Sequence, residues 1–155
     1  MTFRTDLVML GQVFLSFLLG AIIGFEREVR KSPAGVRTYA AVCMGACVFG
    51  VASTHPVVMN YYHSMIDSTR IAAQVASGIG FIGAGVIFKE GLNTVGLTTA
   101  ASLWATAALG LVIAFELYLV AFLIVILMLL MLSLPRFVGY KNIVRKKRIK
   151  RSHEK

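Results

Sequence analysis

Five long apolar runs constrain what this chain can fold into. A helix needs about 20 mainly apolar residues, within a range of about 17 to 25, to cross the hydrocarbon core of a bilayer. Apolar residues make up 57% of the 155 residues, against about 45–50% in ordinary soluble domains, so the surplus must face lipid. We therefore predict an all-α polytopic transmembrane bundle over residues 1–135, followed by a basic tail over 136–155. The runs are Leu7 to Phe25, Thr38 to Thr54, Ile71 to Phe88, Leu97 to Phe115 and Leu117 to Pro135.

The positions of the lysines and arginines predict the orientation. Nine of the sixteen follow Pro135, and four more lie between the first two runs. Because cytoplasmic segments retain basic residues, we expect the N-terminus outside and the C-terminus in the cytoplasm. A basic run beside an apolar one is attracted to anionic lipid head groups, which we expect the tail to contact. The charge of +9 is not spread over a binding face and no recognition motif accompanies it, so we expect no nucleic-acid partner.

Glycines are concentrated in the third run, in the stretch GIGFIGAG. Its G-x-G-x-x-G pattern indicates a dinucleotide site only between a strand and a helix, and here it falls in the middle of an apolar run. Small residues in membrane helices allow close backbone approach, which predicts a tight core of the first, third and fourth runs and a peripheral fifth run. Alternatively, the third helix is broken and coordinates ions near the midplane. The expected helix-packing residues are Gly20, Gly24, Gly78, Gly80, Gly83, Gly85, Ser102, Thr106 and Gly110.

Charged residues border the first two runs, where burial in lipid would be costly. Glu26 and Arg27 end the first run, and Arg37 opens the second. Glu26 can bond Arg30 one helical turn on, or Arg37 across the hairpin; a solvated charged loop is the third reading. These residues are candidates for a functional polar site.

A second polar group precedes the third run. Asp67 is suited to cap the free N–H groups of a helix and to meet the positive end of its macrodipole. It is also a weak candidate ligand for a hard cation such as Mg²⁺, which binds carboxylates and water. Arg70 and Gln74 follow at near-helical spacing, so these three residues predict a polar stripe entering the membrane.

The connection KEGLNTVG joins the third and fourth runs. Gly91 is suited to a helix C-cap, and Asn93 to the turn or to the next N-cap. Trp104 lies in the middle of the fourth run, where we expect it to pack in the core. Phosphate-loop, H-E-x-x-H and metal-cluster patterns are absent from the sequence, so we expect neither an enzyme nor a cofactor.

Two stretches resemble the MgtC/SapB family of bacterial membrane proteins. They are GAIIGFEREVRKSPAGVRTYAAVCMGA and DSTRIAAQVASGIGFIGAGVIFKEGLNTVGLTTAASLWATAALG, and the resemblance covers roughly residues 17 to 113. It implies a multi-pass protein of the bacterial cytoplasmic (inner) membrane with about five spans. It also implies an association with growth at low Mg²⁺ and, in pathogens, with survival inside host cells. Matching positions are Glu26, Arg27, Gly35, Arg37, Thr38, Asp67, Arg70, Gln74, Gly78, Gly80, Gly83, Gly85, Gly91, Asn93, Gly96, Thr99 and Trp104.

One departure from the family pattern concerns the C-terminus. Many members carry a soluble domain after the fifth span, whereas this sequence continues with a basic tail of 20 residues. We therefore expect a short form that lacks the soluble C-terminal domain.

Two functional hypotheses follow. The first is a membrane protein that modulates Mg²⁺ or ion homeostasis, or stress adaptation, by binding another membrane protein; we also expect it to form homo-oligomers. The second is a small oligomeric transporter of Mg²⁺, or one coupled to H⁺. Its path would run from Asp67, Arg70 and Gln74 past the glycine cluster to Glu26 and Arg37.

Overall fold

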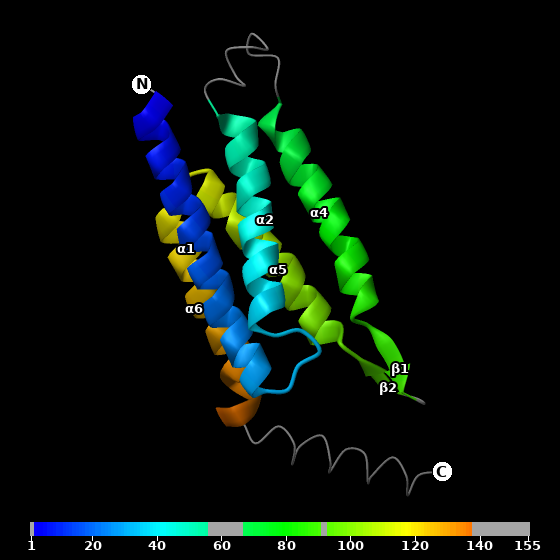
Figure 1. Cartoon of the computed structure of the whole chain (residues 1–155). Helices are drawn as coiled ribbons and strands as arrows, with labels where there is room; N and C mark the ends of the chain where they lie inside the picture. Colours follow the sequence, from blue (N-terminus) through cyan, green and yellow to red (C-terminus); the bar gives the residue numbers. More distant parts are fainter. Residues whose placement is uncertain (1, 56–66, 91–92, 138–155) are drawn as a thin grey trace, which may run out of the picture.

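The protein is an all-α helical membrane protein whose helices form an elongated bundle (Figure 1). The structure is a computed structural model that describes residues 2–55, 67–90 and 93–137. Three helical segments are long and apolar enough to cross a membrane, namely Phe3–Val29, Val36–Thr54 and Leu97–Ala114, and the apolar part of the last helix, Tyr118–Leu134, is shorter. The elements in chain order are α1 (Thr2–Val29), α2 (Val36–Thr54), α4 (Ser68–Gly85), β1 (Phe88–Glu90), β2 (Asn93–Val95), α5 (Leu97–Ala114) and α6 (Tyr118–Phe137).

The connection between α4 and α5 is a short antiparallel hairpin rather than a simple turn. β1 pairs with β2, with Lys89 opposite Thr94, and the hairpin extends beyond the ends of α4 and α5 that it joins (Figure 1). We call this end of the bundle, which also holds the α1–α2 loop, the hairpin end. The opposite end holds the first residues of α1 and α4.

The predicted caps in this connection were wrong. The C-cap of α4 is Val86, and the N-cap of α5 is Gly96 with a φ of 92°. Asn93 pairs within the hairpin instead of capping a helix, and Gly91 lies outside the described residues. Gly96 adopts the left-handed conformation directly against the carbonyl of Val86, so the chain folds back there in a way that only glycine permits without strain.

The core is built around α2, which the sequence prediction had left out of it. α2 packs extensively against both α1 and α5, whereas α4 packs mainly on α5 and α6 packs on α5 and α1. Side chains with no exposed surface, among them Ile23, Tyr39, Cys43 and Leu103, fill the space between α1, α2 and α5. The expected core of the first, third and fourth runs is therefore corrected to the first, second and fourth.

Three glycines explain why α2 takes the central place. A Cβ built on Gly20 would lie 2.7 Å from the Cβ of Cys43, and one on Gly24 would lie 2.7 Å from the Cα of Val36. Gly110 of α5 lies directly against the backbone carbonyl of Cys43 from the other side. Since no side chain fits at these positions, both neighbouring helices approach the backbone of α2 closely.

The glycines of α4 are in a different environment. Gly83 faces Ala100 of α5, with 3.6 Å between a Cβ built on the glycine and the alanine Cβ. Gly78, Gly80 and Gly85 are exposed, and no described atom lies within 4 Å of a Cβ built on any of them. These three do not serve the helix packing predicted for them within the described part of this chain. The helix is also continuous across all four glycines rather than broken.

The outer surface of the bundle is apolar. α6 turns one face inward, with Ala121, Val125, Met128 and Leu132 buried, and exposes most of its other bulky side chains. The expectation of a core position for Trp104 was wrong, because its side chain is 54% exposed. The buried side of α5 instead combines bulky Leu103, Leu109 and Ile113 with small residues, among which Gly110 lets α2 come close.

Candidate functional site

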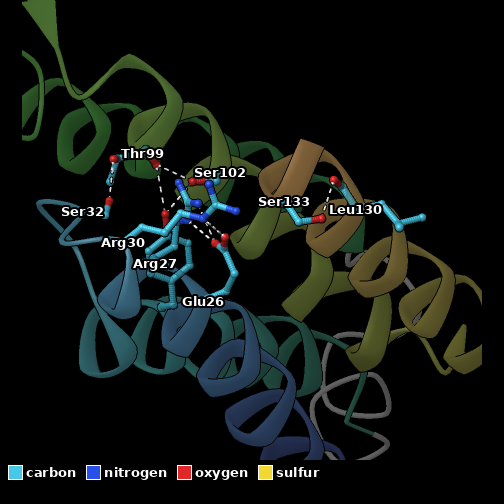
Figure 2. A network of polar contacts seen from close by, with 9 residues as sticks. Glu26, Arg27, Arg30, Ser32, Thr99, Ser102, Leu130 and Ser133 are labelled. Atoms are coloured by element: carbon cyan, nitrogen blue, oxygen red, sulfur yellow. Dashed lines mark hydrogen bonds and ion pairs between the residues drawn. The ribbon is translucent and has the colours of Figure 1, made fainter. Parts of the chain in front are cut away.

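Three charged residues converge at the end of α1 (Figure 2). Arg27, only 7% exposed, donates from Nε to Oε2 of Glu26 at 2.6 Å, and its Nη2 lies 2.6 Å from the same oxygen. Arg30 forms an ion pair with Oε1 of Glu26 through its Nε. One carboxylate thus neutralises one of two guanidinium charges, so the cluster keeps a net positive charge. Pairing is required here because an unpaired buried guanidinium is strongly unfavourable.

Hydroxyl groups link this end of α1 and α2 to the start of α5. The Tyr39 hydroxyl lies 2.5 Å from Oγ of Ser102, and Ser102 donates to the Thr99 carbonyl at 3.0 Å. Ser32 and Thr99 share a hydrogen bond of 2.8 Å between their hydroxyls, which Figure 2 shows as the bridge from the loop to α5. A buried tyrosine needs such a partner, and the network joins α2 and the α1–α2 loop to the start of α5.

Glu28 completes the N-terminus of α2 from a neighbouring helix. The N-cap residue of α2, Gly35, has no side chain to accept a hydrogen bond, and Glu28 accepts one from the Val36 N–H at 2.9 Å. A negative charge at a helix N-terminus satisfies free N–H groups and interacts with the macrodipole. The first helix therefore caps the second.

The local sequence explains how the loop reaches α5. The N–H of Ser32 bonds the Arg27 carbonyl at 3.0 Å, and the N–H of Lys31 bonds the Glu28 carbonyl at 2.9 Å. This is the Schellman pattern that ends helices, here with Lys31 rather than glycine in the left-handed conformation, at a φ of 54°. The sharp reversal places Ser32 beside Thr99.

The structure brings only some of the predicted residues together. Glu26 and Arg27 meet at the hairpin end, and of the two partners considered for Glu26 the structure has Arg30. Arg37 is exposed, and within the described residues it forms no ion pair. Asn93 is also exposed, on β2 of the hairpin.

The second predicted group lies at the opposite end, at the start of α4. Asp67 is the N-cap of this helix, as predicted, and its Oδ1 accepts from the Thr69 N–H at 3.0 Å and from the Thr69 hydroxyl. These hydrogen bonds hold the pKa of Asp67 below its usual value, because they favour the charged carboxylate. Its second oxygen, Oδ2, lies 3.9 Å from Nε of Arg70.

The arrangement around Asp67 is unfavourable for a metal ion. One carboxylate oxygen already serves the helix cap, and the other faces a guanidinium, which repels a cation. Among residues 2–55, 67–90 and 93–137, no group of three or more histidine, cysteine, aspartate or glutamate side chains is placed to hold a metal. Gln74 is exposed on α4, toward the middle of the bundle.

Sequence reasoning missed three residues of the hairpin-end site, namely Glu28, Ser32 and Tyr39, and it named Thr99 only as a position that matches the family pattern. Signals for two of them were present. Tyr39 is a phenol inside an apolar run, which predicts a buried hydrogen-bond partner. Glu28 is a carboxylate shortly before a helix that begins at a glycine, so an external cap was foreseeable.

The fold and its two polar groups define a class of protein: a helical membrane protein in which the charged side chains of the described residues lie at the two ends of the bundle. A model of the MgtC family matches residues 13–140. The chain belongs to the MgtC family.

Individual relatives agree with this assignment. The chain is 52% identical over 95 residues to "Protein MgtC" of Brucella abortus (strain 2308), covering 61% of this chain and 37% of the relative. It is 43% identical over 116 residues to the "Putative magnesium transporter YhiD" of Escherichia coli (strain K12), covering 71% of this chain and 54% of the relative. The match to "Protein MgtC" of Salmonella typhimurium (strain LT2) is 50% over 95 residues, covering 61% of this chain and 38% of the relative. The chain thus spans between about a third and about half of these relatives, and no solved structure matches it.

Proposed function

We propose that this chain is a non-enzymatic, multi-pass protein of the bacterial inner membrane that takes part in Mg²⁺ homeostasis. The proposal is supported by family membership and by a relative whose name refers to magnesium transport. The excess of basic residues at the hairpin end supports a cytoplasmic location for that end. These residues are Arg27, Arg30, Lys31, Arg37 and Lys89.

In this proposal the protein acts by binding another membrane protein, or a second copy of itself, through α4. The observation that carries it is the exposed ladder of small residues on this helix: Ala73, Ala76, Ser77, Gly80 and Ala84. No described atom lies within 4 Å of a Cβ built on Gly80. Ladders of this kind allow close approach of a second membrane helix.

Site-specific crosslinking in the membrane tests this mode of action. A photoreactive residue replaces Gly80 on the ladder or, as a matched control, Phe14, which is 62% exposed on α1. Cells are irradiated under Mg²⁺ starvation. We expect a discrete protein adduct from position 80 and only lipid adducts from position 14. Protein adducts absent from both positions, or equal at both, would remove the basis for this mode of action.

A transporter is the second candidate, favoured by the sequence of polar residues at the start of α4. Asp67, Arg70 and Gln74 lead from the opposite end toward the middle of the bundle. Mg²⁺ and H⁺ flux is measured in liposomes carrying purified wild type or Asp67→Asn, beside empty vesicles. Flux that the substitution abolishes supports transport along α4, whereas folded protein without flux supports the binding function.

A further inference from the structure

A groove between α2 and α4 has no occupant among the described residues. Its volume is about 540 Å³, within the range of about 300–1,000 Å³ typical of ligand pockets. Gly45 of α2 and Gly78 of α4 form parts of its walls, and no described atom lies within 4 Å of a Cβ built on either. Gln74 is the one polar residue among the described residues that line it.

Polarity changes in order along one wall of this groove. Residues 70, 74, 78 and 82 follow each other in steps of four, so they form a row along α4. Gln74, Gly78 and Ile82 line the groove. Arg70, whose side chain is 85% exposed, lies one turn before Gln74, outside the lining, at the end of the row where the helix begins. Asp67 lies beside the charged end, with its Oδ2 3.9 Å from Arg70.

This order matches a phospholipid with an amine head group, and we propose that the groove retains one. An acyl chain would lie between α2 and α4, the ester groups would lie beside Gln74, and the head group would lie at the start of the helix. The Arg70 guanidinium, 3.9 Å from Oδ2 of Asp67, would bind the phosphate, and this neutralises its charge and leaves Oδ2 for the ammonium. Neighbouring opposite charges complement a zwitterionic head group better than an anionic one.

Two further observations favour a lipid over a helix of a second copy in this groove. The groove lies on one side of α4 and the ladder of Ala76, Gly80 and Ala84 lies on the other, so the surface suited to a helix is elsewhere. In addition, an exposed amide such as that of Gln74 is unfavourable against hydrocarbon without a partner. The ester carbonyls of a phospholipid in the groove would accept hydrogen bonds from this amide.

The experiment compares the same substitution on the two sides of α4. Gly78→Leu fills the groove, whereas Gly80→Leu lies on the ladder, and a Cβ built at either position has no described atom within 4 Å. Each full-length protein is purified in mild detergent, and retained phosphatidylethanolamine or phosphatidylglycerol is counted by native mass spectrometry after addition of equal amounts. A thermal unfolding curve confirms that each variant is folded.

We expect wild type and Gly80→Leu to retain phosphatidylethanolamine in preference to phosphatidylglycerol, and Gly78→Leu to lose it several-fold. Arg70→Gln and Asp67→Asn should each reduce this preference without filling the groove. Equal retention by the two leucine variants, equal binding of the two lipids by wild type, or loss of oligomers instead of lipid in Gly78→Leu would each overturn the proposal. Loss of oligomers in Gly80→Leu alone bears only on the proposed binding function, so the two ideas fail separately.

Discussion

Glycine has opposite consequences in two regions of this molecule. In the core of α1, α2 and α5, the backbone at Gly20, Gly24 and Gly110 lies against a neighbouring helix, and a methyl group there would overlap its atoms. On α4, Gly78 and Gly80 have no described atom within the reach of a methyl group. The same pattern of small residues therefore serves internal packing in one region and leaves an open surface in the other. The two regions differ in whether a neighbouring helix lies against the glycine.

A similar contrast holds between the buried polar cluster at the hairpin end and the exposed one at the start of α4. Of the substitutions considered, Glu26→Gln should lower the free energy of unfolding the most. The substitution leaves the buried Arg27 without its counter-ion, which we expect to cost about 3–5 kcal/mol of unfolding free energy. Asp67→Asn at the exposed end should cost much less, since asparagine also caps helices. Unfolding in detergent measures both, and Arg27→Met combined with Glu26→Gln should recover part of the loss. Equal losses from Glu26→Gln and Asp67→Asn would contradict the contrast.

Replacement of glycine by alanine should change the free energy of unfolding in opposite directions in the two regions. Gly20→Ala is expected to cost about 1–3 kcal/mol, the range for overpacking, because the added methyl overlaps Cys43. Gly80→Ala should stabilise the protein by about 0.4–1 kcal/mol, because alanine restricts the unfolded chain and meets no neighbour. Thermal unfolding of both variants checks the sign, and a gain in stability for Gly20→Ala would contradict the packing described for α2.

Removal of one hydroxyl tests the network at the hairpin end. Tyr39→Phe deletes the 2.5 Å contact with Ser102, which we expect to cost about 0.5–1.5 kcal/mol, the usual net contribution of a hydrogen bond. The double variant with Ser102→Ala should lose less than the sum of the two single losses, since each single variant already removes the contact between the hydroxyls. Full additivity of the two losses would show that the hydroxyls do not interact.

The smallest expected effect concerns the pH dependence of the cap on α4. Because the folded-state pKa of Asp67 is lowered by its hydrogen bonds with Thr69, its contribution is present above the unfolded-state pKa. It is lost as the pH falls through the lowered folded-state value. The difference in thermal stability between wild type and Asp67→Ala should therefore shrink on acidification. Asp67→Asn has no titrating group at this position and serves as the control. A difference in thermal stability between wild type and Asp67→Ala that stays constant down to strongly acidic pH would exclude a role for the carboxylate charge.

The sequence predicts the helical elements of this fold better than it predicts their neighbours. Length and apolarity indicated a helical membrane protein, and the spacing of Glu26 and Arg30 indicated their ion pair. The central place of α2 could not be predicted from its small residues. Ala41 and Gly45, and Ala46 and Gly50, lie four apart, but the same spacing occurs on α4, so it does not identify which helices meet. The hairpin was missed because a three-residue strand carries almost no periodicity, and because the left-handed conformation of Gly96 is a tertiary property.

The polar contacts show the same difference between local contacts, which could be predicted, and contacts between elements, which could not. Asp67 was predicted to cap its helix because the acceptor and the N–H groups are two residues apart. The hydrogen bond between Glu28 and Val36 joins two different helices, and the contact between Ser32 and Thr99 joins residues 67 positions apart. Contacts of that kind depend on how helices meet, which a single sequence does not specify.

The hydrogen bond from Val36 to Glu28 has a consequence for biosynthesis. The acceptor that completes the start of α2 is carried by the last turn of α1, so it is in place only when the preceding segment is already helical. During synthesis the first helix emerges before the second, so the carboxylate of Glu28 is already present when the N-terminus of α2 forms. The two segments are therefore suited to enter the bilayer together as one helical hairpin.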